Sequence, residues 1–226
     1  MSNNTSDKPV KMSQFFDEKV SGYEDHMKQT IPSFEEFYGL ISACIVETKG
    51  KIAILDLGCG TGIELEGIFS KAPNAVITCI DLSGKMLSKL KNKYTRFLDQ
   101  INLIKGSYLT VPFQEKNYDY AVSVMTMHHL LPDTKGKLYE KIKKSLRNKG
   151  KYIEGDYVVS PEKEQQCLVE YYERIKGVNV FREEVYHLDI PFSVETQTQL
   201  LLKAGFSNVK IKWQENEAAI FIASVK

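Results

Sequence analysis

Three alternating glycines, Gly58, Gly60 and Gly62, follow an apolar run at residues 52–55 and the carboxylate of Asp56. An apolar run of this kind that ends in glycines predicts a strand followed by bare backbone, against which a bulky ligand can lie. A second apolar run at residues 75–80 ends in Asp81, where a neighbouring parallel strand would present a carboxylate to a ribose diol. Two anchors on adjacent strand ends indicate a nucleoside ligand.

The spacing of the glycines narrows the choice of nucleoside. A dinucleotide fingerprint reads G-x-G-x-x-G, whereas this chain reads G-x-G-x-G and has Ile63 after the last glycine. Asp56 and Glu64 bracket the loop with negative charge, which disfavours a phosphate and suits a ligand that carries an ammonium or a sulfonium group. The pattern therefore points away from NAD.

Taken together, these motifs resemble the class I S-adenosylmethionine-dependent methyltransferases. The resemblance rests on ILDLGCGTG at 54–62, IDLS at 80–83, YDYAVS at 118–123, HHL at 128–130 and LRNKGK at 146–151. It implies an α/β fold with a Rossmann-like, doubly wound, seven-stranded and mostly parallel sheet, an antiparallel last strand, N-terminal helices and a small helical cap. It also implies S-adenosylmethionine as cofactor and S-adenosylhomocysteine as product.

The resemblance further implies a set of donor-binding residues. In the family, glycines lie near the methionine portion, a carboxylate binds the ribose, apolar residues such as Leu82 and Met86 surround the adenine, and a tyrosine of an N-terminal lid covers the donor. The donor-binding residues expected here are Tyr23, Asp56, Gly58, Cys59, Gly60, Asp81, Leu82, Met86, Ser107, Tyr108 and Met125. Ser107 stands where the family often has a carboxylate that binds the adenine amino group, and a hydroxyl can still accept one hydrogen bond.

Several of these residues have a plainer alternative. Asp56 can equally order the loop or cap a helix, and Asp81 can cap the helix that starts near Ser83. Tyr23 can be an ordinary core aromatic, which would look the same in the sequence. Both readings stay open at this point.

His128 and His129 follow the fourth predicted strand and are the general-base candidates, because an unperturbed histidine has a pKa near ~6.5. Adjacent side chains are not expected to face the same pocket. The alternative that the sequence favours is that one histidine orders the loop before Pro132 while the other points to solvent.

Composition constrains the function from another side. The net charge is +1, from 30 basic and 29 acidic residues, so nucleic acid is not expected as a partner. The four cysteines have no C-x-x-C spacing, and no metal site or disulfide framework is expected. No segment approaches the ~18 apolar residues that span a bilayer. We expect a cytoplasmic enzyme with a small-molecule acceptor and no membrane partner, and a homodimer stays open.

The chain is expected to hold a tail at 1–9 and one domain at 10–226. Within the domain we expect an N-terminal helical lid (10–48, two helices), a donor-binding core (51–157), a cap insertion (158–193), and a last helix with a terminal strand pair (194–226). Strands and helices alternate at 51–57, 63–71, 75–81, 84–97, 101–105, 118–124, 134–147 and 150–157, which predicts parallel strands with right-handed crossovers.

Aromatic residues of the cap insertion can line the acceptor side or simply pack a helical hairpin on the sheet. They are Tyr171, Tyr172, Phe181, Tyr186 and His187.

Three functions compete with methyl transfer to a small nucleophile. One is modification of S-adenosylmethionine itself for tRNA modification, for which Arg174 and Arg182 could hold a carboxylate. The others are a non-catalytic donor-binding module and a nicotinamide oxidoreductase.

Overall fold

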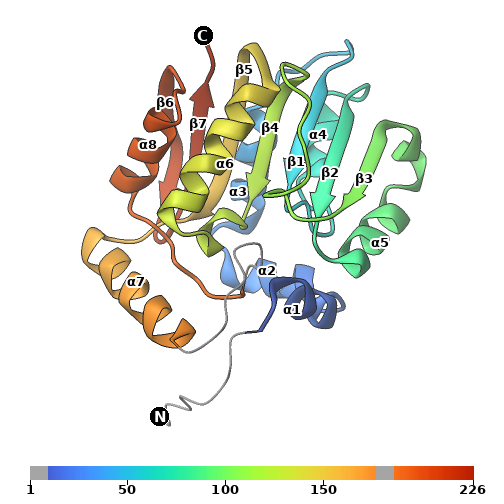
Figure 1. Cartoon of the computed structure of the whole chain (residues 1–226). Coiled ribbons are helices and arrows are strands. Elements are labelled where there is room, and N and C mark those ends of the chain that lie inside the picture. The colour runs from blue at the N-terminus through green and yellow to red at the C-terminus, as the bar shows by residue number, and fades with distance from the viewer. Residues whose placement is uncertain (1–9, 177–185) are drawn as a thin grey trace.

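The computed structural model describes residues 10–176 and 186–226, so the predicted tail at 1–9 lies outside the described residues. Its centre is a seven-stranded sheet of order β3-β2-β1-β4-β5-β7-β6 (Figure 1). The strands are β1 (Ala53–Leu57), β2 (Val76–Asp81), β3 (Ile101–Lys105), β4 (Tyr118–Val124), β5 (Leu146–Tyr157), β6 (Asn208–Glu215) and β7 (Ala218–Ser224).

Strand pairing confirms the predicted fold class. β1 pairs in parallel with β2 and β4, and β2–β3 and β4–β5 are parallel as well. β7 is antiparallel to both of its neighbours, β5 and β6. The chain therefore folds as a Rossmann-like sheet with one antiparallel strand, and β6 and β7 are the predicted terminal pair.

Helices cover both faces of the sheet. One apolar core lies under α3 (Phe34–Ala43), α4 (Leu65–Lys71) and α5 (Gly84–Lys93), and the other lies under α6 (Pro132–Ser145) and α8 (Val194–Lys203). The central strands are buried on both faces, which is why β1 and β4 are mostly apolar in the sequence and do not alternate between apolar and polar residues.

The N-terminal segment differs from the prediction. Helical spacing from Phe15 to Tyr23 predicts one helix there, but the chain turns at residues 20–22 and forms α1 (Met12–Lys19) and α2 (Tyr23–Thr30). Gly22 stands directly before α2, and a glycine there interrupts helical continuity at little steric cost. Between residue 10 and β1, the described chain therefore forms three helices rather than two.

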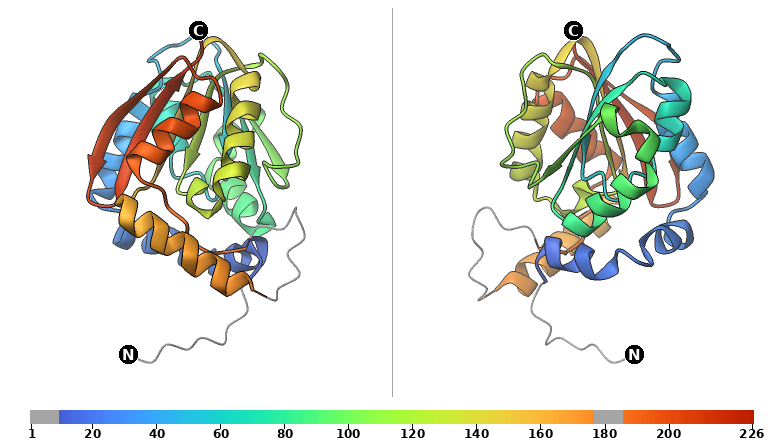
Figure 2. Two further views of the ribbon diagram at one scale, coloured as in Figure 1. Left: turned by 60° about the vertical axis from the view of Figure 1, so that its left-hand side comes forward. Right: turned by 90° about the vertical axis from the view of Figure 1, so that its right-hand side faces the viewer.

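The helices α1 and α2 lie at the carboxyl ends of the parallel strands, at the lower edge of the sheet in Figure 1. The cap helix α7 (Pro161–Ile175) is at the same end, and Figure 2 shows all three gathered there while the other helices flank the sheet. In open α/β sheets this is the edge at which ligands bind.

Candidate active site

The loop after β1 is shaped by glycines in the left-handed region of backbone space. Gly58, Gly60 and Gly62 have φ values of 70°, 51° and 71°, which residues with a Cβ rarely adopt. A Cβ on Gly58 would lie 2.5 Å from Thr126 Oγ1, and one on Gly60 would lie 3.6 Å from the Tyr23 ring. The alternating glycines are therefore required by backbone conformation and by close neighbours.

Asp81 at the end of β2 is tied to this loop. Its Oδ2 accepts a 2.8 Å hydrogen bond from the Gly60 N–H, and its Oδ1 accepts one of 2.8 Å from the Ser83 N–H. The cap of α5 is Ser83, whose hydroxyl accepts from Met86 N at 3.0 Å. Asp81 is thus not the helix cap, and its remaining lone pairs are available to a ligand.

One narrow cavity of about 40 Å³, which we call the donor cavity, is lined by most of the predicted donor-binding residues. Nine of them line it: Tyr23, Gly58, Gly60, Asp81, Leu82, Met86, Ser107, Tyr108 and Met125. Met12, Phe16 and Thr126 also line it and were not predicted. No motif marks them in the sequence, because two belong to an ordinary amphipathic helix and Thr126 is a loop residue.

Two predicted donor residues, Asp56 and Cys59, do not line this cavity. Asp56 is 1% exposed and Cys59 is 4% exposed. Both Asp56 oxygens and Glu64 Oε1 are buried without a hydrogen-bond donor among the described residues. Burial raises the pKa of the Asp56 carboxyl well above its ordinary value, and neighbouring Glu64 adds to the rise. Any influence of Asp56 on a donor must therefore pass through the loop or a bridging water.

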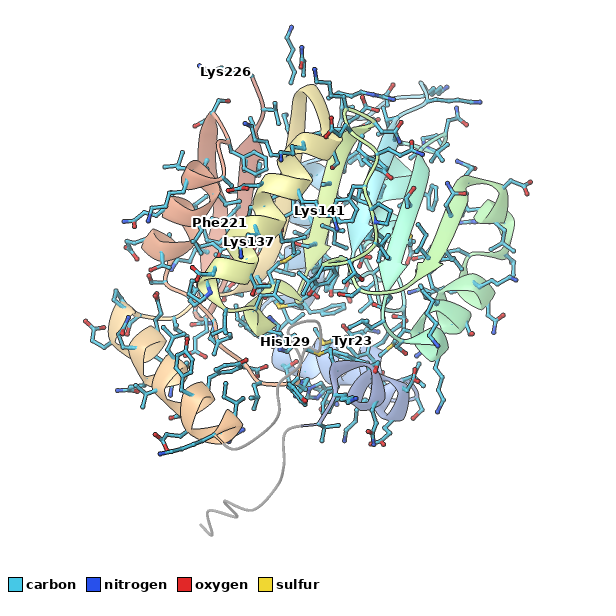
Figure 3. All side chains as sticks on the ribbon, in the orientation of Figure 1. Tyr23, His129, Lys137, Lys141, Phe221 and Lys226 are labelled. Atoms are coloured by element: carbon cyan, nitrogen blue, oxygen red, sulfur yellow. The ribbon has the colours of Figure 1, made fainter. Side chains whose placement is uncertain are left out.

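Tyr23, the first residue of α2, covers the glycine loop. Burial raises the pKa of its hydroxyl well above the ordinary value, and the nearby Glu64 and Asp81 carboxylates add to this, so the hydroxyl stays protonated. Figure 3 shows Tyr23 and His129 beside each other below the strand ends. Tyr23 therefore lies against the glycine loop, and its role as a lid over a donor stays a prediction.

Met125, directly after β4, has a positive φ of 51°, which is uncommon for a residue with a Cβ. Its N–H donates a 2.8 Å hydrogen bond to the Gly155 carbonyl of β5, which holds the turn in place. The next residue, Thr126, lies against Gly58 and has its Oγ1 3.2 Å from the Tyr108 hydroxyl. The turn after β4 therefore joins the wall of the donor cavity.

A second cavity, of about 650 Å³, adjoins the first through the shared residues Phe16, Tyr23 and Met125. Its lining also includes His128, His129, His187 and Asp189, which we call the histidine cluster. The expectation that the two adjacent histidines face different ways is wrong. Residues 127–129 form a 3₁₀ turn, η2 (Met127–His129), and both buried rings reach this cavity.

Hydrogen bonds and short contacts hold the histidine cluster together. His128 Nδ1 lies 2.5 Å from Asp156 Oδ1, and His128 Nε2 lies 3.7 Å from Asp189 Oδ1. His129 Nδ1 lies 3.1 Å from the same Asp189 oxygen. The Ile190 N–H donates a 2.7 Å bond to the His128 carbonyl, which fixes the segment that carries Asp189 against η2.

The histidines differ in charge preference. Burial lowers the pKa of His129 to about 4, and the neighbouring His128 contributes to this, so His129 is neutral at pH 7. Burial also lowers the pKa of His187. Burial opposes the charged form of His128 too, but the Asp156 carboxylate outweighs it and raises the pKa of His128. The cluster thus offers neutral imidazoles beside one that favours a positive charge.

Of the five predicted cap residues, His187 reaches the second cavity, where its ring stacks on Phe15 of α1 with centroids 3.5 Å apart. Tyr186 is buried, whereas Tyr171 and Tyr172 lie on α7 outside both cavity linings and Tyr172 is 56% exposed. Phe181 lies outside the described residues.

The residues that line the donor cavity suit S-adenosylmethionine better than a dinucleotide. It combines a bare glycine loop, the Asp81 carboxylate and apolar walls from Leu82 and Met86. None of its described lining residues is Lys or Arg, so they offer no cationic side chain to a pyrophosphate. A seven-stranded sheet of this order with such a crevice is the architecture of the S-adenosylmethionine-dependent methyltransferases.

Comparison with known proteins also points to an enzyme that uses S-adenosylmethionine. Residues 54–150 match a methyltransferase domain family. The carboxy-S-adenosyl-L-methionine synthase of Nautilia profundicola is 26% identical over 236 residues, covering 99% of both chains. The synthase of Wolinella succinogenes is 28% identical, covering 92% of both. Together these matches support a class I S-adenosylmethionine-dependent methyltransferase, an enzyme that uses S-adenosylmethionine.

Solved structures share the fold. Phosphoethanolamine N-methyltransferase 2 of Haemonchus contortus, in complex with S-adenosyl-L-methionine, superposes with a TM-score of 0.68 at 17% identity, covering 95% of this chain and 58% of that chain. Human N-acetylserotonin methyltransferase has a TM-score of 0.56 at 19% identity, covering 76% of this chain and 47% of that one. The chain spans less than two thirds of these two enzymes.

Among the helices described for residues 10–176 and 186–226, none is long and apolar enough to cross a membrane.

Proposed function

We propose that this enzyme transfers the methyl group of S-adenosylmethionine to a small-molecule nucleophile that occupies the second cavity. The observation that carries the proposal is the shared wall between the two cavities. Phe16, Tyr23 and Met125 contact both spaces, so a ligand in the larger cavity would lie next to the sulfonium end of a donor in the smaller one. A space of about 650 Å³ suits a small organic molecule.

Methyl transfer asks little of the protein beyond alignment. A lone pair of the acceptor attacks the methyl carbon, the carbon–sulfur bond breaks, and its electron pair stays on sulfur in S-adenosylhomocysteine. An acceptor that carries a proton must also release it. The imidazole of His187 on the cavity wall, whose pKa burial lowers, is suited to accept that proton at pH 7.

A second candidate function is the synthesis of a carboxylated S-adenosylmethionine, favoured by the synthases that match this chain over almost its full length. A carboxylate product calls for a buried cation near the sulfonium carbon. Among the described residues that line either cavity, Lys19 is the one Lys or Arg, and it is exposed. Arg174 is exposed on α7, and Arg182 lies outside the described residues. Because no buried Lys or Arg is found among the described residues that line either cavity, we favour methyl transfer over donor carboxylation.

The decisive experiment follows the fate of the donor by mass spectrometry. The enzyme is incubated with methyl-labelled S-adenosylmethionine and a library of small alcohols, amines, thiols and carbon nucleophiles. A second arm adds a carboxyl source, either bicarbonate or a carboxylic acid that readily loses CO₂. We expect S-adenosylhomocysteine together with one labelled methyl product. A donor-derived product heavier than S-adenosylmethionine by a CO₂ unit, formed without S-adenosylhomocysteine, would instead establish the second function. Omission of the library is the control for donor breakdown.

A further inference from the structure

The geometry points to a binding site for a divalent transition-metal ion formed by His128 Nε2, His129 Nδ1 and Asp189 Oδ1. The inference rests on the proposed function, because we assign the ion the task of holding the acceptor. One ligand atom from each of these three residues lies within 4.8 Å of the other two. The sequence predicts no metal site because the aspartate comes from the distant cap region.

The two distances from Asp189 Oδ1 to the histidine nitrogens suit one small ion. Zinc binds histidine nitrogen and carboxylate oxygen at about 2.0–2.2 Å, so tetrahedral ligand atoms are about 3.4 Å apart. Asp189 Oδ1 lies 3.7 Å from His128 Nε2 and 3.1 Å from His129 Nδ1. Two imidazoles and one carboxylate are ligands that zinc, iron and cobalt accept, with open positions left for a substrate.

A separate observation concerns the orientation of His128. Its Nδ1 is bound to the buried Asp156 carboxylate at 2.5 Å, so the proton on that nitrogen is held there. In the neutral form of His128, Nε2 then carries a lone pair and lies 3.7 Å from the Asp189 oxygen, which is itself an acceptor. Two acceptors that face each other need a cation between them, either a proton or a metal. A carboxylate behind a histidine is also the usual outer contact that orients a metal-bound imidazole.

The site lies where an ion could act on the acceptor. His128, His129 and Asp189 line the second cavity together with Tyr23 and Met125, which also line the donor cavity. A hydroxyl or thiol bound to the ion would lose its proton more readily. His187, whose ring centroid lies 5.0 Å from that of His129, would take that proton. The freed lone pair would attack the methyl carbon while sulfur keeps the pair of the broken bond.

The test measures metal binding without any acceptor. Untagged protein is stripped with a chelator, saturated with S-adenosylhomocysteine and titrated with Co²⁺, whose visible absorption reports nitrogen and oxygen ligands. We expect one saturable site, a loss of at least about 10-fold in affinity for Asp189→Asn, and a similar loss for Asp156→Asn. Glu18→Gln is the matched control, because Glu18 lines the same cavity outside the three ligands, and it should bind Co²⁺ as the unmodified protein does.

Equal Co²⁺ binding by Asp189→Asn and the unmodified protein, or no absorption change at all, would overturn the site. Circular dichroism of each variant separates loss of a ligand from loss of the fold. Methyl transfer at full rate by metal-stripped enzyme would overturn the assigned task of the ion. Because the titration uses no acceptor, its outcome does not depend on whether methyl transfer or donor carboxylation is the reaction.

Discussion

The side chain of Asp81 and the backbone N–H of Gly60 are joined by a hydrogen bond of 2.8 Å, which links the end of β2 to the loop after β1. Burial raises the pKa of Asp81, although this hydrogen bond and one from the Ser83 N–H oppose the rise. The carboxylate is therefore positioned by main chain before any ligand arrives. Pre-positioning of this kind reduces the entropy lost on binding.

Replacement of Asp81 by alanine should weaken S-adenosylmethionine binding by about 3 kcal/mol, or about 100-fold, because two charge-assisted hydrogen bonds to the ribose would be lost. Calorimetric titration measures this effect. Asp99→Ala is the control, since Asp99 is exposed in η1 (Thr95–Gln100) away from the cavity. Unchanged affinity in Asp81→Ala would show that the ribose lies elsewhere.

Introduction of a methyl group at Gly58 should disturb the loop. The backbone there has φ 70°, and the new Cβ would lie 2.5 Å from Thr126 Oγ1, so we expect a loss of about 1–3 kcal/mol in unfolding free energy and weaker donor binding. Denaturant titration and calorimetry measure the two effects. Gly136→Ala in α6 is the matched control: nothing lies within 4 Å of the Cβ that this change would add, and it should stabilise by about 0.5–1 kcal/mol.

The buried Asp56 carboxyl predicts a pH effect on stability. Its pKa is raised in the folded chain, whereas in the unfolded chain it is about 3.9. The folded state therefore holds this proton more tightly, and the stability it contributes at low pH is lost as pH rises from about 4 towards the folded pKa. Asp56→Asn keeps the side chain neutral at every pH. Between about pH 4.5 and pH 7 this variant should therefore lose less unfolding free energy than the unmodified protein.

Urea titrations at several pH values test this prediction, with Asp99→Asn as the control for a surface carboxyl. Parallel pH profiles of Asp56→Asn and the unmodified protein would mean that Asp56 ionises normally in the fold.

Ser83 joins the lid to the core. Its hydroxyl donates a 2.5 Å hydrogen bond to Asp17 Oδ1 of α1 and accepts one from Met86 N at the start of α5. Ser83→Ala should lose both contacts and about 1 kcal/mol of stability. Asp17→Ala should lose the hydrogen bonds that Asp17 Oδ1 accepts from the Ser83 hydroxyl and from the Lys85 N–H, but it keeps the Ser83 cap of α5, so the melting temperature should change less than in Ser83→Ala.

Hydrogen exchange of α1 and α2 distinguishes the two Ser83 contacts. Both variants should speed exchange in these helices, while the Met86 N–H of α5 should exchange faster in Ser83→Ala alone. Slow exchange of α1 in Asp17→Ala would mean that the lid is held by its apolar contacts.

Apolar periodicity was sufficient to predict the sheet, because each central strand is buried on both faces and ends in a turn. β4 spans 118–124 as predicted, whereas β5 begins at Leu146 rather than at residue 150. The donor cavity was largely predictable for the same reason, since its residues follow strand ends. The position of Asp189 in the second cavity was not predictable, because no periodic pattern places the cap region beside His128. The outward orientation expected for one histidine failed because a 3₁₀ turn brings both rings to one side.

Phe16 and Tyr23 form part of the wall of both cavities, and the smaller of the two is narrow. The two cavities thus share a wall from α1 and α2, and the smaller one, of about 40 Å³, must widen before it can admit an adenosine. An acceptor bound in the larger cavity would contact the same wall and hinder the release of S-adenosylhomocysteine. We therefore expect the two substrates to load in a fixed order, and the lifting of α1 and α2 to pace each catalytic cycle.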